Sequence, residues 1–141
     1  MSQIEKQARK IAEKFLRLLK KKNCYLEIYL VSNQKMKFLN KKFRHQNKTP
    51  SVLSFKEPKN FPHPESQLKF LGEIYLKSPI ILRQAQDTSS KDTEQSRSAN
   101  YKLLITLLAH GLLHLLGFQH QKRSDRIKME NKEKWLISSL V

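Results

Sequence analysis

Hydrophobic positions recur along the chain at helical spacing in some segments and gather in short β-rich runs in others. The first segment has apolar residues three or four positions apart, a Lys-rich opposite face and a capping Ser2, which predicts an amphipathic helix. A short run of aromatic and aliphatic residues follows and predicts a strand. The next segment opens with Ser32 and has one apolar face, formed by Met36, Leu39 and Phe43, so we expect a second helix. These predicted elements are a helix over 4–19, a strand over 24–31 and a helix over 33–44.

The rest of the chain adds two strand candidates and the most apolar helix. A loop with three prolines separates the strands, and Ser78-Pro79 is a favourable helix start. A polar, turn-rich segment after that helix predicts a loop. The next segment is apolar nearly all round and predicts a buried helix, and in the last one Ile127, Trp135 and Leu136 are expected to face inward. These predicted elements are strands over 51–55 and 70–77, helices over 79–86, 100–116 and 124–140, and a loop over 87–98.

Strands and helices are mixed without repeats, and 141 residues fit one domain, residues 1–141. We expect an α+β fold in which a small mixed sheet of about four strands packs with about five helices. The single cysteine, Cys24, excludes an internal disulfide and is expected to be a buried structural thiol. No targeting or membrane-spanning segment is visible in the sequence, which predicts a cytoplasmic protein.

Charge narrows the class of partner. Lys and Arg total 28 against 12 Asp and Glu, a formal net charge of +16. A field of this sign favours a polyanionic partner such as nucleic acid. Two alternatives stay open on charge alone: a host that uses much lysine, and, more weakly, an anionic membrane surface.

Three of the five histidines lie in one stretch, HGLLHLLGFQH, at the end of the buried helix. His110 and His114 are four residues apart, so they share one helix face and can reach the same metal ion. Gly117 tolerates the left-handed conformation that ends a helix, which lets the chain return His120 to that ion. Three imidazoles leave an open position for water, as in a catalytic zinc site, although nickel or copper would also suit them. The sequence predicts one metal ion at the C-terminal end of the central helix, where it would lower the pKa of water toward ~7.

The pattern HxxxHxxGxxH is shared with metzincin proteases, which place a Glu directly after the first histidine as general base. Here that position is Gly111. Without the carboxylate a peptidase lacks its base, and the basic surface gives no reason to prefer a peptide substrate. A protease is therefore disfavoured.

The histidine stretch resembles the H-G/S-x-L-H-L-x-G-Y-D-H signature of the YbeY family of bacterial single-strand-specific endoribonucleases and ribosomal RNA maturation factors. Further blocks are similar and lie in the same order: Leu39-Asn40 through Arg44, then 52–55 (VLSF), then 71–74 (LGEI). The resemblance implies an α+β fold, a zinc held by the three matching histidines and an arginine, Arg44, needed for activity. It also implies ribosomal RNA as substrate and an association with the small ribosomal subunit.

Under this hypothesis Arg44 and His114 are catalytic, and Arg44 would clamp the scissile phosphate, which a planar guanidinium does better than an ammonium. The sequence also departs from the family pattern: Gln119 replaces Asp, Pro50-Ser51 replaces Thr-Asp, and Glu73 replaces Asp. A carboxylate usually orients a ligand imidazole, so the loss at 119 weakens the site or moves that role elsewhere, and Glu73 is favoured as a structural strand residue. The alternative function is a ribosome-associated RNA-binding assembly factor with a mainly structural metal.

Overall fold

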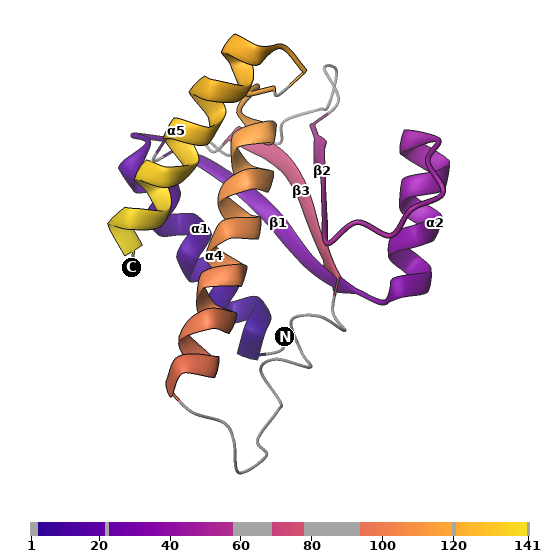
Figure 1. Cartoon of the computed structure of the whole chain (residues 1–141), viewed down its shortest axis with the longest axis horizontal. Coiled ribbons are helices and arrows are strands. Elements are labelled where there is room, and N and C mark those ends of the chain that lie inside the picture. Colours follow the sequence, from indigo (N-terminus) through magenta and orange to yellow (C-terminus); the bar gives the residue numbers. More distant parts are fainter. Residues whose placement is uncertain (1–2, 22, 58–68, 78–93, 120, 141) are drawn as a thin grey trace.

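Four helices and three strands form the part of the chain that the structure, a computed structural model, describes: residues 3–21, 23–57, 69–77, 94–119 and 121–140. The described residues form a small α+β domain, as predicted (Figure 1). Their sheet has one strand fewer than expected, because each of the three β-rich runs gives one strand. The predicted helix over 79–86 lies outside the described residues. The elements are α1 (Gln3–Leu18), β1 (Cys24–Val31), α2 (Asn33–Arg44), β2 (Val52–Lys56), β3 (Lys69–Lys77), α4 (Glu94–Leu115) and α5 (Arg123–Leu140).

The sheet is mixed and has the strand order β1-β3-β2. The central strand β3 pairs in parallel with β1 and antiparallel with β2. A register shift between Tyr25 and Glu27 of β1 marks an irregularity opposite Gly72 of β3, whose φ is +143°. A Cβ at position 72 would lie 2.1 Å from the carbonyl oxygen of Phe55, so only glycine allows β2 and β3 to approach here.

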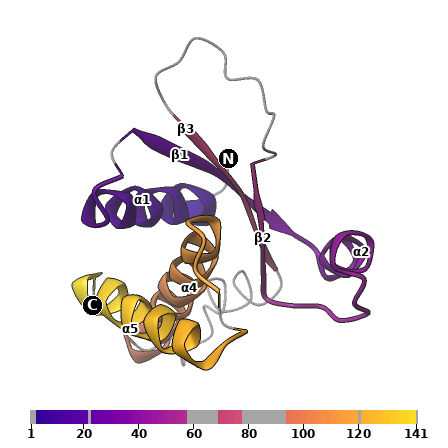
Figure 2. The same cartoon turned by 90° about the horizontal axis from the view of Figure 1, so that it is seen from above.

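Helices α1, α4 and α5 gather on one side of the sheet (Figure 2). Helix α4 is the central one, and Leu108 and Leu112 are fully buried in a core that also contains Phe15 of α1 and Ile74 of β3. Gly111 lets α4 approach the sheet closely, because a Cβ there would lie 3.2 Å from Ile74 Cδ1. The packing of α4 on β2 and β3 therefore fixes where its C-terminal end, with the histidines, lies.

Helix α2 stands apart from the other helices, on the β2 side of the sheet (Figures 1 and 2). Ser32 caps it as predicted, since its hydroxyl oxygen accepts a hydrogen bond of 3.1 Å from the backbone N–H of Lys35. Met36 and Leu39 are buried with Leu53 in a second, smaller hydrophobic cluster. The apolar face predicted from Met36, Leu39 and Phe43 is buried only in part, because Phe43 is 52% exposed.

Two other sequence predictions need correction. Helix α4 begins at Glu94, so residues 94–98 are helical and not a loop: the polar Glu, Gln and Arg of this segment are good helix formers. In α5, Leu136 is buried as expected, but Ile127 and Trp135 are 47% and 42% exposed. The inward stripe of α5 instead joins Met129 to Leu136, seven residues apart.

Cys24 is partly buried against the main core. No helix in the described ranges combines the length and the apolar composition needed to cross a bilayer.

Candidate active site

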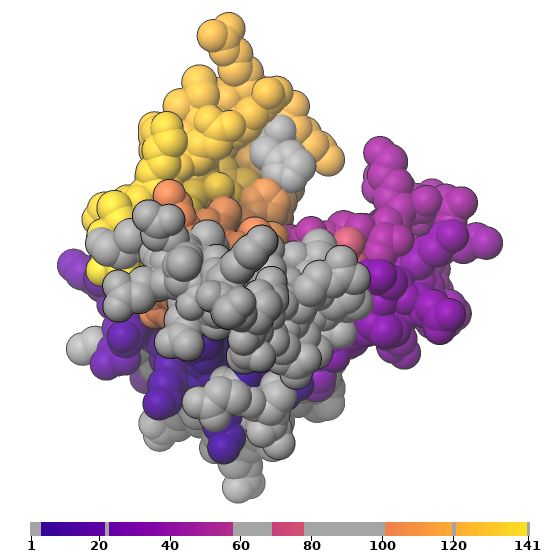
Figure 3. Space-filling view, turned by 60° about the horizontal axis from the view of Figure 1, so that its bottom comes forward, coloured from indigo at the N-terminus to yellow at the C-terminus, as the bar shows by residue number. Residues whose placement is uncertain are grey.

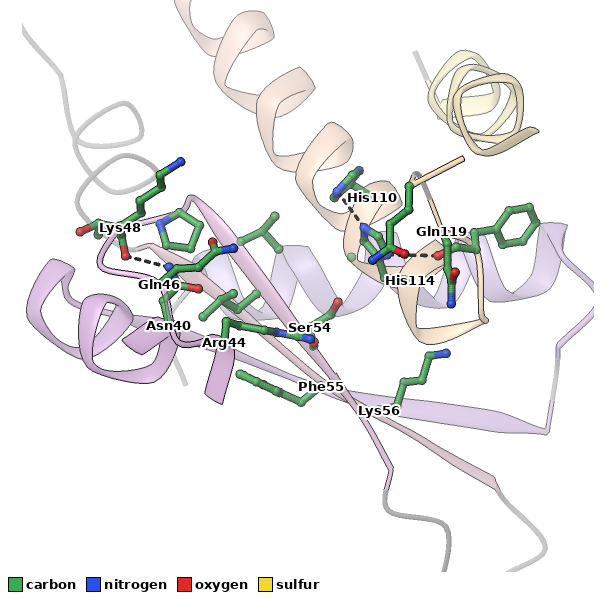
Figure 4. A pocket seen from close by; sticks show the side chains of 17 residues that line it. Asn40, Arg44, Gln46, Lys48, Ser54, Phe55, Lys56, His110, His114 and Gln119 are labelled. Carbon is green, nitrogen blue, oxygen red and sulfur yellow. Dashed lines mark hydrogen bonds between the residues drawn. The ribbon is translucent and has the colours of Figure 1, made fainter. Parts of the chain in front are cut away.

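A cleft of about 930 Å³ separates the C-terminal end of α4 from β2 and the end of α2. In the space-filling view it opens between the magenta α2 and the orange and yellow α4 and α5 (Figure 3). Figure 4 shows Arg44 on one wall and His110 and His114 on the opposite wall. The fold thus brings two blocks that are about 70 residues apart in sequence to one cavity. The described residues lining it are Asn40, Arg44, Gln46, Lys48, Thr49, Pro50, Val52–Lys56, His110, Gly111, His114, Phe118, Gln119 and Gln121.

The end of α4 has the geometry expected from its glycine. Gly117 has a φ of +100°, its N–H donates to the carbonyl of His114 (3.1 Å), and the N–H of Phe118 donates to the carbonyl of Leu113 (2.9 Å). This pair of bonds is a Schellman motif, which ends the helix and turns the chain back over its last turn. The turn brings the Phe118 carbonyl to the His114 ring. The third predicted ligand, His120, lies outside the described residues.

His110 and His114 meet through their Nε2 atoms, which are 3.1 Å apart. Each Nδ1 atom has a hydrogen-bond partner of its own. Nδ1 of His114 lies 3.1 Å from the carbonyl oxygen of Phe118, which can only accept, so this nitrogen carries a proton. Nδ1 of His110 lies 2.7 Å from Oε1 of Glu133, so a carboxylate is its partner. Both rings are therefore oriented by acceptors at Nδ1 and turn Nε2 toward the cleft (Figure 4).

Glu133 is the residue that sequence reasoning missed. It lies on α5 four residues after Met129 and three before Leu136, so it occupies a position on the inward stripe of that helix. Its side chain is only 19% exposed. The signal available in the sequence was a carboxylate at an inward-facing position of the helix that follows the histidine motif. Position 119 carries Gln where the family pattern has Asp, and Glu133 provides a carboxylate that orients a ligand imidazole, here that of His110.

This arrangement fits a metal ion. With a proton on both Nδ1 atoms, two neutral rings would point two Nε2 lone pairs at each other across 3.1 Å, an arrangement that a shared proton or a bound metal ion relieves. Two imidazole ligands of one tetrahedral zinc have Nε2 atoms about 3.4 Å apart, close to the observed distance. Within the described ranges no third His, Cys, Asp or Glu completes a metal-binding group.

Arg44 is the last residue of α2, and two contacts of its guanidinium fix its position. Its Nη2 donates to the carbonyl oxygen of Ser54 at 2.6 Å, and its guanidinium carbon lies 5.2 Å from the centroid of the Phe55 ring. The turn after it is anchored by Asn40, which is 3% exposed and donates from Nδ2 to the carbonyl oxygen of Lys48 at 3.0 Å. The remaining donors of an exposed guanidinium stay available to a phosphate.

The described lining of the cleft includes three cations, Arg44, Lys48 and Lys56, and no Asp or Glu. Such a wall attracts anions and offers no carboxylate base. Gln119 and Pro50, two of the positions that depart from the family pattern, both line the cleft. Glu73 is outside the described lining, and it accepts a hydrogen bond of 2.8 Å from the Tyr75 hydroxyl on the same strand.

Gly111 has a packing role that the comparison with proteases did not foresee. It lines the cleft floor but turns its Cα toward Ile74 and Val52, which a Cβ would approach to 3.2–3.4 Å. A side chain here would meet the sheet before it reached the histidines. A larger residue at position 111 would therefore have to push the Ile74 and Val52 side chains aside by a few tenths of an ångström.

The fold and the cleft together define a class of protein: a small α+β domain in which a histidine pair with metal-ligand geometry faces an arginine. The family model described as endoribonuclease YbeY matches residues 1–141, and the chain belongs to this family. An endoribonuclease YbeY of Thermodesulfovibrio yellowstonii is 35% identical over 116 residues, which cover 82% of this chain and 66% of the relative. One of Buchnera aphidicola is 29% identical over 123 residues, covering 87% and 74%.

The matched regions thus span about two thirds to three quarters of these relatives. A Thermotoga maritima protein with a known solution structure has a TM-score of 0.53 to this chain at 23% identity, covering 94% of this chain and 78% of the other. That likeness supports the fold alone.

Proposed function

We propose that the chain is a metal-dependent endoribonuclease that cuts single-stranded RNA during ribosomal RNA maturation. The observation that carries the proposal is the placement of Arg44 and the His110–His114 pair on facing walls of one basic cleft. The curated relatives carry the name endoribonuclease, which agrees with this chemistry. We expect the protein to act in the cytoplasm, with the small ribosomal subunit as its partner.

His110, His114 and His120 would hold the metal, with zinc as the expected ion and nickel a possible substitute. When bound, the metal supplies Lewis acidity for the phosphoryl centre and for water. Glu133 and the Phe118 carbonyl keep the proton on Nδ1 of each described ring, so that Nε2 faces the cleft. Arg44 binds a nonbridging phosphate oxygen and stabilises the charge that develops there during cleavage.

A second candidate, an RNA-binding assembly factor with a structural metal, predicts that binding and cleavage separate. The cleft favours the nuclease, because an oriented guanidinium opposite the ligand pair is what phosphodiester chemistry needs and a structural metal does not.

The test is cleavage of a fluorescent single-stranded RNA by zinc-loaded protein, beside its duplex form and beside Arg44→Lys and His114→Ala variants. We expect cleavage of the single strand only, a loss of about 10²–10³-fold in kcat for Arg44→Lys, and no cleavage by His114→Ala. Arg44 is exposed, so its variant should keep the melting temperature of the wild type. Equal cleavage by all three proteins would refute the assignment.

A further inference from the structure

Helix α2 exposes two aromatic rings that its fold does not need. Phe38 and Phe43 are 54% and 52% exposed, whereas the apolar residues that attach the helix to the sheet, Met36 and Leu39, are at most 7% exposed. An exposed phenylalanine costs solubility and contributes little packing energy. A pair of such rings on one short helix points to a ligand.

The two rings are part of a row that begins inside the cleft. Phe55 lines the cleft and holds the Arg44 guanidinium at 5.2 Å. Phe43 meets Phe55 edge to face, with ring centroids 5.3 Å apart. The Lys42 ammonium lies 5.4 Å from the Phe43 centroid and 5.6 Å from the Phe38 centroid, so one cation lies between the two exposed rings. These ring and cation contacts therefore lead from Phe55 in the cleft wall to the exposed rings of α2.

Cations accompany every ring of this row. The Lys35 ammonium lies 5.6 Å from the Phe38 centroid, on the same ring that Lys42 approaches. The segment 33–56 contains seven Lys and Arg residues and no Asp or Glu. Proteins bind single-stranded nucleic acid with surfaces on which aromatic rings and cationic side chains alternate, because bases stack on the rings while ammonium groups contact phosphates. A lipid or peptide partner would not call for this regular alternation.

We propose that Phe38, Phe43, Lys35 and Lys42 form a binding track that carries the single-stranded RNA outside the cleft. This inference rests on the proposed function, because the track extends the same RNA site. Nucleotides beyond the cleaved linkage would stack on the α2 rings, with Lys42 between their phosphates. The track would make affinity depend on the length of the RNA strand, and it would prefer a flexible single strand, since bases in a duplex cannot stack on protein rings.

The experiment is binding of fluorescent oligouridines of about 4 and about 12 nucleotides, a range of lengths typical of single-strand sites, in EDTA so that no cleavage competes. For wild type we expect the longer strand to bind more tightly. Phe38→Ala should weaken binding of the longer strand about tenfold and bring it toward the affinity of the shorter one. Phe38→Leu should weaken binding of the longer strand as much as Phe38→Ala does, whereas Phe38→Trp should keep the wild-type affinity. Lys42→Gln should reduce the salt dependence by about 0.7 in log–log slope, the value for one phosphate contact on a single strand.

A matched control is available on α5. Trp135 is 42% exposed and lies 5.0 Å from the Lys132 ammonium, so it is the same kind of ring–cation pair outside the described cleft lining. Trp135→Ala should leave both affinities unchanged. The proposal is overturned if Phe38→Ala binds the longer strand as wild type does, if Phe38→Leu keeps the affinity, or if Trp135→Ala loses as much. Because binding is measured without metal, failure of the track and failure of the nuclease activity are distinguishable.

Discussion

Removal of the Glu133 carboxylate tests the link between α5 and the histidine pair. Glu133 Oε1 lies 2.7 Å from Nδ1 of His110, a charge-assisted hydrogen bond in length. Without it the His110 ring loses both its orienting partner and the negative charge that makes Nε2 a stronger ligand. We expect Glu133→Ala to weaken zinc binding about 10–100-fold. Glu133→Gln keeps an acceptor but not the charge, so its loss should be smaller.

The loss of affinity has a thermal consequence. A ligand that binds only the folded state stabilises it in proportion to the logarithm of its affinity, so each tenfold loss removes about 1.4 kcal/mol of metal-induced stability. For a domain of this size that corresponds to a melting temperature lower by about 5 °C in the presence of zinc. Zinc affinity from competition with a chromophoric chelator and the melting temperatures with and without zinc check the two numbers independently.

Glu130→Gln is the matched control, because Glu130 is exposed on the same helix and its variant removes the same charge. It should bind zinc as wild type does. If Glu133→Ala and Glu130→Gln have equal zinc affinities, Glu133 does not support the metal ligands and the interpretation of the 2.7 Å contact is wrong.

Three further predictions concern the scaffold. Gly111→Glu should create no peptidase activity. It should lower the free energy of unfolding in urea by about 3 kcal/mol or more, because it forces a side chain against Ile74 and buries a carboxylate. A variant as stable as wild type would contradict the close approach of α4 to Ile74. Lys20 closes the Schellman motif after α1 with a φ of 60°, a left-handed conformation that glycine adopts at lower cost. Lys20→Gly should therefore raise the free energy of unfolding by about 0.5–1 kcal/mol in the same assay. A loss of stability would refute this. Burial and the hydrogen bond to Glu73 raise the pKa of Tyr75 to about 12 from 10.0. The unfolded chain then ionises first at this residue, so the contribution of Tyr75 to stability should be constant below pH 10 and be lost as the pH rises toward 12; an equal fall in Tyr75→Phe would exclude Tyr75 as its cause.

Local patterns in the sequence predict the elements that depend on local chemistry. The strand over 24–31 and the helix over 33–44 have the predicted bounds, since Ser32 caps the helix and its apolar face is formed by Met36 and Leu39. The left-handed Gly117 also follows from residue type, because glycine is the residue that a Schellman motif favours. The spacing of His110 and His114 predicted their shared face, and the 3.1 Å between their Nε2 atoms agrees with it.

Features that depend on long-range packing could not be predicted in the same way. Glu133 meets His110 because α5 packs on α4; periodicity can place Glu133 on the inward face of α5, but it does not reveal which side chain of another helix Glu133 contacts. The exposure of Phe38 and Phe43 depends on how α2 is attached to the sheet, and an apolar residue on a helix is ordinarily expected to face inward. Arg44 could be placed opposite the histidines only through a resemblance, since 66 residues separate it from His110.

The metal proposed for His110 and His114 would lie in the cleft that Arg44 faces. The most direct measurement is an anomalous difference map from crystals of the zinc-loaded protein, recorded on both sides of the zinc edge, with metal content determined on the same sample. We expect one ion per chain, bonded to Nε2 of His110 and of His114, on the wall opposite Arg44. An ion bound elsewhere, or an RNA-cleaving protein that contains no metal, would contradict it.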